Sequence, residues 1–119
     1  MTEKYKQYIL IRTDKYFPVG KVMAHCSHNA VKNFCTNAMD YDVMTVRFNV
    51  WFNHNDMTTI VLDAKSLKKI YCIVNKARDM GIPTSFIKDI HLKDKICASI
   101  GPVTDEEAEE LGLKKLKLY

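Results

Sequence analysis

The chain has 119 residues, of which 47% are hydrophobic and 27% are charged, and this length and balance are those of one globular domain. The longest strongly apolar run, residues 8–11, is too short to span a bilayer, and no apolar signal region precedes it. We therefore expect a cytoplasmic protein with one domain over residues 1–119 and no membrane association. The formal charge of +4 is uneven, because residues 104–119 hold five of the 14 acidic residues, which leaves a net +6 on residues 1–103. That excess suits an anionic partner such as nucleic acid, and a solvated basic surface is the alternative.

The first half of the chain predicts a strand followed by two helices. Residues 6–13 have a continuous apolar centre, which is typical of a strand covered on both faces. After a loop, a helix is predicted from residue 19 or 20 to about residue 37, because apolar residues recur at intervals of three and four. Its expected buried positions are Val22, Met23, Cys26, Ala30 and Phe34. A second helix is predicted over about residues 41–52, with a strand over residues 44–51 as the alternative because β-branched residues are frequent there.

The middle of the chain predicts a strand and a helix. Residues 58–62 form the strand, and Asp63 is expected to cap a helix that runs to about residue 80. Gly81 ends this helix, and Pro83 prevents its continuation. The expected buried positions are Leu67, Ile70, Tyr71, Val74 and Ala77. Lysines decorate its other side.

The last third predicts strands over residues 84–88 and 95–100, and then a short helix for which Thr104 and Glu107 form a capping box. Residues 113–119 are expected to return as an extended tail. Since helices separate most of the strands, crossover connections are required. The sequence therefore predicts an α/β fold with a mainly parallel or mixed sheet and helices on both faces.

The cysteines lack the C-x-x-C spacing of metal or redox motifs, and we expect them to be reduced and mostly buried. They are Cys26, Cys35, Cys72 and Cys97. A metal site around residues 25–28 is disfavoured, because Cys26 lies on a different helix face from His25 and His28. We predict no metal and no cofactor.

One side of the first predicted helix is polar. Lys21, His25, His28 and Lys32 follow at intervals of four, three and four, and this side is expected to lie away from the apolar stripe. The helix begins beside Gly20, which leaves its free backbone N–H groups open to an anion. A helix start, an ammonium group and two imidazoles together indicate a candidate functional site, with a solvated face as the alternative.

Asp89 is the second candidate, because it follows a predicted strand and open α/β sheets bind ligands at the ends of their strands. A carboxylate near Lys21 stays ionised and can act as a base or orient a water molecule. A loop aspartate that caps a turn is the alternative.

Residues 20–31, Gly-Lys-Val-Met-Ala-His-Cys-Ser-His-Asn-Ala-Val, resemble the G-K-x-A-A-Q-x-S-H-A segment of the type II peptidyl-tRNA hydrolase family. The first strand, the strand end at residues 85–89, a turn at residues 100–102 and the closing residues 116–119 match in the same order. The resemblance implies a mixed four-stranded sheet between helices, and commonly a homodimer. It also implies hydrolysis of the ester that joins a nascent peptide to the 3′ end of tRNA.

Matched by motif, Lys21, His28 and Asp89 take the places of the family's site residues. The sequence departs from the family where His25 replaces a glutamine, and where Ile96 stands at about the position of a threonine. The loop after Asp89 is also shorter than the family's and lacks its hydroxyl groups.

The resemblance favours a hydrolase in which Asp89 activates water, Lys21 holds the oxyanion or the terminal phosphate, His28 orients its neighbours and His25 forms hydrogen bonds. The tRNA backbone is expected to meet a set of lysines, which are Lys32, Lys65, Lys68, Lys69 and Lys76. Two alternatives stay open: a catalytically decayed module of the same fold that binds RNA or a protein, and nucleophilic catalysis by Cys26, which conflicts with its expected position facing the core.

Overall fold

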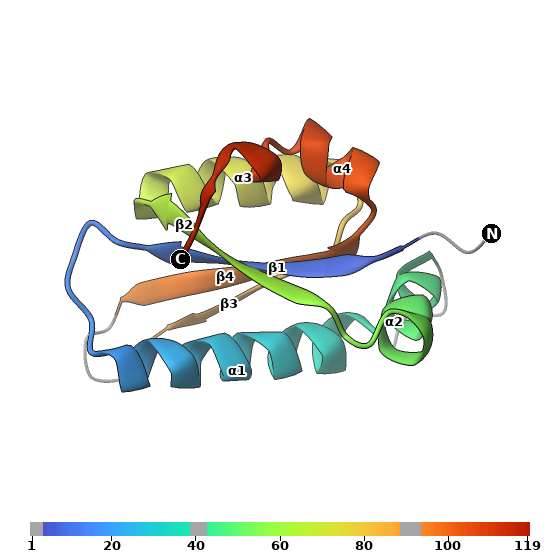
Figure 1. The fold of residues 1–119 in the computed structure, drawn as a ribbon, viewed down its shortest axis with the longest axis horizontal. Coiled ribbons are helices and arrows are strands. Elements are labelled where there is room, and N and C mark those ends of the chain that lie inside the picture. The colour runs from blue at the N-terminus through green and yellow to red at the C-terminus, as the bar shows by residue number, and fades with distance from the viewer. Residues whose placement is uncertain (1–3, 39–42, 89–93) are drawn as a thin grey trace.

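The computed structural model describes residues 4–38, 43–88 and 94–119, and these form one mixed sheet between two layers of helices (Figure 1). Five strands are hydrogen-bonded in the order β3-β4-β1-β2-β5. In chain order the elements are β1 (Lys6–Arg12), α1 (Val19–Asn37), α2 (Val43–His54), β2 (Thr59–Lys65), α3 (Leu67–Asp79), β3 (Thr84–Lys88), β4 (Lys95–Val103), α4 (Asp105–Glu110), the 3₁₀-helix η1 (Leu113–Lys115) and β5 (Lys117–Leu118). The α/β class is confirmed, and residues 43–54 are helical rather than extended.

The central strand β1 pairs in parallel with β2 and antiparallel with β4. Its apolar run is continuous because both faces of the sheet are covered. Ile9 and Ile11 pack toward α1, whereas Tyr8 and Leu10 belong to the core under α3 and α4. The prediction of a strand buried on both sides is therefore confirmed.

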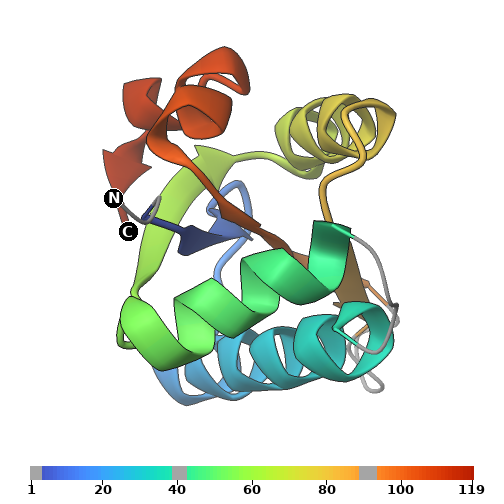
Figure 2. The same cartoon turned by 90° about the vertical axis from the view of Figure 1, so that its right-hand side faces the viewer.

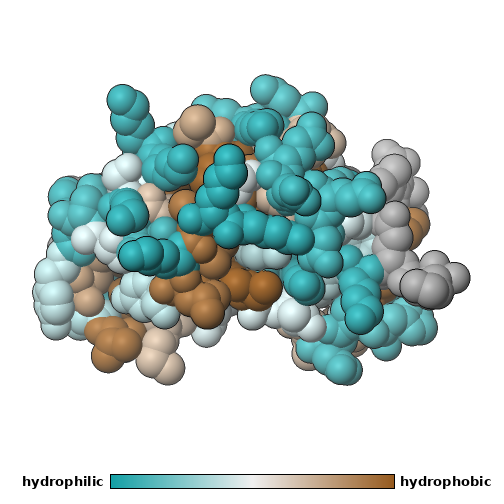
Figure 3. Space-filling model, turned by 45° about the horizontal axis from the view of Figure 1, so that its top comes forward, coloured by the Kyte–Doolittle hydropathy of each residue, from teal (hydrophilic) through white to brown (hydrophobic). Residues whose placement is uncertain are grey.

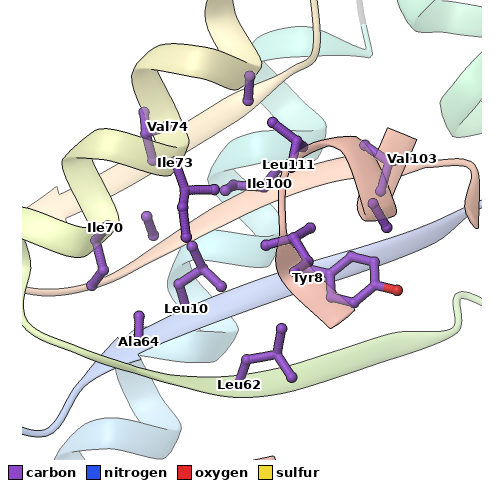
Figure 4. Packing of buried hydrophobic residues seen from close by; sticks show 14 of the residues in the cluster. Tyr8, Leu10, Leu62, Ala64, Ile70, Ile73, Val74, Ile100, Val103 and Leu111 are labelled. Atoms are coloured by element: carbon purple, nitrogen blue, oxygen red, sulfur yellow. The ribbon is translucent and has the colours of Figure 1, made fainter. Parts of the chain in front are cut away.

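The larger core lies between the sheet and the layer of α3, α4 and η1 (Figure 4). Leu10 and Ile100 of the sheet meet Ile70, Ile73 and Val74 of α3 there, and each of these side chains is at most 5% exposed. Figure 2 shows α3 and α4 side by side on this face, with α1 and α2 on the other. Hydrophilic side chains dominate the outer surface of the α3 and α4 layer, with some apolar surface between them (Figure 3).

Helix α1 covers the other face with an unexpectedly polar side. Its buried residues are Val22, His25, Asn29 and Asn33. The predicted apolar stripe is therefore only partly right, because Met23 is 64% exposed and Phe34 is 37% exposed. The physical reason is that the two asparagines reach backbone carbonyls of β4: Asn33 Nδ2 donates to Gly101 O at 2.8 Å and Asn29 Nδ2 to Cys97 O at 3.3 Å.

Helix α3 begins later than predicted. Strand β2 continues through Asp63 to Lys65, and Ser66 caps the helix by accepting a hydrogen bond from Lys69 N at 3.2 Å. The expected cap at Asp63 is therefore wrong, since its carboxylate instead accepts hydrogen bonds from Thr13 Oγ1 and Lys65 N. The buried residues of α3 are Ile70, Ile73, Val74 and Ala77, while the predicted Leu67 and Tyr71 are only half-buried. Gly81 follows the helix with a φ of 74°, as its predicted role requires.

The C-terminal part supplies the strand that was not predicted. After the confirmed capping box of Thr104 and Glu107, the extended tail pairs with β2 as β5, so that the sheet has five strands instead of four. The expected turn at residues 100–102 is instead the end of β4. Gly101 is required there, because it has a φ of 104° and an added Cβ would lie 2.8 Å from Val103 N.

All four cysteines are free thiols, as predicted, but they are not mostly buried. Cys97 is buried and Cys26 is half-buried, whereas Cys35 and Cys72 are exposed. Cys35 and Cys72 lie on the solvent-facing sides of α1 and α3, because the helical period turns these two positions away from the core.

Candidate active site

The start of α1 is open to an anion. Pro18 is the residue before the helix, and its side chain makes no capping hydrogen bond to the first turn. Gly20 is exposed, and an added Cβ there would meet nothing within 4 Å, so that a ligand can approach the backbone N–H groups. Lys21 lies half-buried in this turn. The turn therefore combines an ammonium group with the positive end of the helix dipole.

A cavity of about 530 Å³ lies beside this turn, where β1 ends. It is lined by Arg12, Thr13, Asp14, Lys15, Tyr16, Phe17, Val19 and Tyr119. Strand β5 carries the chain end there, since Tyr119 N donates to Val61 O at 3.0 Å. The cavity thus lies at the carboxyl end of the parallel pair β1 and β2, the position at which α/β sheets bind ligands.

A charged cluster centred on Arg12 fixes the wall of this cavity. Arg12 is 6% exposed and binds both carboxylate oxygens of Asp14, with Nε–Oδ1 and Nη2–Oδ2 distances of 2.8 Å. Its Nη1 donates to Asp94 Oδ2 at 3.0 Å and to Lys95 O at 3.3 Å. Lys15 Nζ also reaches Asp94, at 3.2 Å. One guanidinium therefore joins the end of β1, the following loop and the start of β4.

The cluster holds its carboxylates ionised. The hydrogen bond from Arg12 lowers the pKa of Asp14 below its ordinary value. Hydrogen bonds from Lys95 N and from Lys15 lower the pKa of Asp94 in the same way. The hydrogen bond with Asp14 raises the pKa of Arg12, which stays charged throughout. Neither carboxylate is thus a strong base near neutral pH, and their role is to position the loop.

The two histidines of α1 do not share one solvent-facing side. His25 is 8% exposed and packs toward the sheet beside Val22, whereas His28 is exposed. The expectation that His25 lies away from the buried stripe is wrong, because the buried side of α1 carries polar residues that meet the polar groups of β4. The two rings nevertheless stay in contact edge to face, with centroids 6.1 Å apart.

Cys26 faces the core of the protein. It packs on a cluster that includes Ile9, Ile11 and Cys97, and it shares a hydrogen bond with the Cys97 thiol. That bond lowers the pKa of Cys26, while the same bond and burial raise the pKa of Cys97. Asn29 Nδ2 lies 2.8 Å from Cys97 Sγ and completes the contact. The reading of Cys26 as facing the core is therefore supported.

The predicted RNA-binding lysines do not lie on one face. Lys68 and Lys69 are exposed at the start of α3, and Lys65 is exposed at the end of β2. Lys76 Nζ donates to Glu110 O at 2.7 Å. Lys32 lies on α1, on the opposite side of the sheet, and donates to Phe86 O at 2.7 Å (Figure 1). A tRNA backbone that met all five would have to wrap an edge of the sheet.

Two positions that were compared with the family motif, Asp89 and Ile96, remain to be placed in the structure. Asp89 lies outside the described residues, which end at Lys88 and resume at Asp94. Ile96, at about the position of the family's threonine, is 0% exposed in the core under α1 and provides no hydroxyl. Sequence reasoning missed Arg12, Asp14 and Asp94, although a charged run directly after a buried strand was a usable signal.

Among the residues that the structure describes, no group of three or more His, Cys, Asp or Glu side chains lies close enough to hold a metal ion. Within the same residues, no helix has the length and apolar character needed to cross a membrane.

Comparison with known proteins agrees with this architecture. The sequence profile of the family described as peptidyl-tRNA hydrolase PTH2 matches residues 5–119. A peptidyl-tRNA hydrolase of Thermococcus sibiricus is 31% identical over 109 residues, covering 87% of this chain and 88% of the relative. A protein of the same name from Metallosphaera sedula is 28% identical, and the match covers 89% of this chain and 93% of the relative. Another, from Thermococcus onnurineus, is 27% identical over 91% of this chain and 92% of the relative. The chain therefore belongs to the PTH2 family of peptidyl-tRNA hydrolases.

Proposed function

We propose that the protein hydrolyses peptidyl-tRNA by cleaving the ester between the peptide and the 3′ end of tRNA, and that it does so in the cytoplasm as part of translation. The observation that carries the proposal is the first turn of α1, which holds Lys21 and whose Val19 lines the cavity of about 530 Å³. Membership of the family is the basis for the reaction that we propose. This turn offers positive charge, which stabilises the negative charge that develops during ester hydrolysis.

Ester hydrolysis needs a stabilised oxyanion and an activated water molecule. Lys21 and the N–H groups of the first turn supply positive charge for the oxyanion or for the terminal phosphate. Arg12 and Lys15 add positive charge to the cavity wall, while Asp14 and Asp94 fix their positions. The base in this proposal is Asp89, since neither Asp14 nor Asp94 has a raised pKa.

The histidines take supporting roles. His28 is exposed on the side of α1 that carries Lys21, at a spacing of two helical turns, and it orients groups around the lysine. His25 is buried and meets the edge of the His28 ring, so that it fills the place of the family's glutamine as a hydrogen-bonding group rather than as a proton carrier.

A decayed module that binds RNA or a protein is the second candidate, and one observation favours it. Ile96 has an apolar side chain, so the hydroxyl of the family's threonine has no counterpart at that position. A hydrolase must then work without that hydroxyl group, whereas a binding module needs only the basic surface.

Site variants test the proposal. With the enzyme in excess over an N-acetylated aminoacyl-tRNA, Lys21→Ala and Asp89→Asn should each slow the single-turnover rate by about 10²–10⁴-fold, the usual contribution of an acid–base or oxyanion group. Lys115→Ala is the matched control, because Lys115 is exposed on η1. Rates for the site variants that equal the control rate would contradict the assignment, provided that all variants keep the wild-type circular dichroism spectrum.

A further inference from the structure

The edge of the sheet at β3 carries a basic groove that is separate from the cavity at the start of α1. It has a volume of about 370 Å³ and is lined by residues of α1, α3, β3 and β4. These residues are Lys32, Thr36, Arg78, Thr84, Ser85, Phe86, Lys88 and Lys95. Four of the eight are cationic and none is acidic, so that the lining itself offers no neutralising carboxylate.

Three of the cations are held in place. Lys32 Nζ, from the α1 side, donates to Phe86 O at 2.7 Å, and Arg78 Nε, from the α3 side, donates to Thr84 Oγ1 at 3.1 Å. Lys95 Nζ donates to Tyr71 Oη at 2.7 Å and lies 4.7 Å from the centroid of the Phe86 ring. These bonds go to neutral groups, and therefore each side chain keeps its charge and has further N–H groups for a ligand.

One of the lining residues, Ser85, carries a buried hydroxyl group. Ser85 is 6% exposed, and its Oγ has no hydrogen-bond partner among the described residues. A buried hydroxyl without a partner is costly, and a bound acceptor would remove that cost.

We propose that this groove binds the sugar–phosphate backbone of the RNA substrate. The assignment rests on the proposed function and deepens it by locating where the RNA is held. Charge complementarity favours RNA over a protein strand. An added peptide strand needs exposed backbone groups along the edge, and here Lys32 already occupies the Phe86 carbonyl while lysines flank the edge. Phosphate oxygens accept hydrogen bonds from Arg, Lys and Ser alike.

A paired substitution tests the groove. Arg78→Gln with Lys88→Gln removes two positive charges from exposed positions of the groove, and Lys114→Gln with Lys115→Gln removes two from η1, beside the opposite edge of the sheet. Binding of fluorescently labelled deacylated tRNA is measured between 50 and 200 mM salt. The groove variant should bind at least about tenfold more weakly, and its salt slope should fall by about two, one for each lost phosphate contact. The η1 variant should bind like the wild type.

The kinetics separate this proposal from the hydrolase proposal. With N-acetylated aminoacyl-tRNA as substrate, the groove variant should raise KM about tenfold and leave kcat unchanged. If the wild type binds tRNA but does not cleave it, the hydrolase proposal fails and the binding titration still decides the groove. If the groove variant binds and cleaves like the wild type, the groove proposal is overturned while the hydrolase stands. Unchanged tRNA binding together with self-association of the groove variant would show that these cations only protect the edge strand.

Discussion

Arg12 joins three segments around the candidate active site, and replacing it with methionine measures how much that junction contributes. Methionine keeps most of the buried stem but removes the hydrogen bonds to Asp14, Asp94 and Lys95 O. Hydrogen bonds to charged groups contribute about 1.5–3 kcal/mol each, and exposed ion pairs about 0.2–1 kcal/mol. The side chains of Asp14 and Asp94 are 38% and 29% exposed, so water replaces much of what they lose. We therefore expect about 1 kcal/mol per carboxylate, or about 2 kcal/mol of unfolding free energy and about 8 °C in Tm.

The pH dependence of this loss tests its electrostatic origin. Carboxylates with a lowered pKa stabilise the folded state above their ordinary value of about 3.9, and this stability is lost as the pH falls through the lowered value. The difference between wild type and Arg12→Met in urea unfolding should therefore be full at pH 7 and shrink below about pH 4. Arg78→Met is the control, because Arg78 is exposed and bonds only to a neutral hydroxyl in the described contacts, so it should lose under about 0.5 kcal/mol. Equal losses for the two variants, or a difference that does not depend on pH, would refute the reasoning.

Three further predictions concern stability, the site and assembly. Glu107→Ala should lower the unfolding free energy by about 3 kcal/mol in urea titrations, because it breaks the partly buried ion pair with Arg47 and the capping box. Burial opposes ionisation of Glu107, but hydrogen bonds from Arg47 and Thr104 outweigh it and lower its pKa. This stability should therefore disappear as the pH falls through the lowered value. His25→Gln should keep kcat within about tenfold, and a larger loss of kcat in a folded variant would show instead that His25 carries a proton. Sedimentation equilibrium should show a homodimer, and a single 13.8 kDa species at high concentration would contradict it.

Local patterns predicted most of the elements, because each depends on residues close together in the sequence. The apolar run of β1, the glycine that ends α3 and the capping box of α4 are of this kind. The fifth strand was missed because residues 117–118 form it by pairing with β2, which lies more than 50 residues earlier. Sequence periodicity alone does not reveal such a partner.

The candidate site was predicted less well than the fold. Lys21 and the open helix start follow from the sequence near Gly20, but the Arg12 cluster joins residues that are 82 positions apart. His25 was placed on the wrong side because helical periodicity was read from apolar residues alone. The buried side of α1 is polar, since Asn29 and Asn33 bind backbone carbonyls of β4, and only the packed structure shows this.

Cleavage by the wild-type protein is the most direct test of the central claim. An excess of enzyme is mixed with N-acetylated aminoacyl-tRNA, and free peptide and intact tRNA are measured beside a filter-binding assay on the same samples. The account predicts that the wild type releases the acyl group in a single turnover. Lys21→Ala should bind the tRNA but release the acyl group about 10²–10⁴-fold more slowly. A wild-type protein that binds the tRNA without cleaving the ester would contradict the hydrolase and leave the binding module.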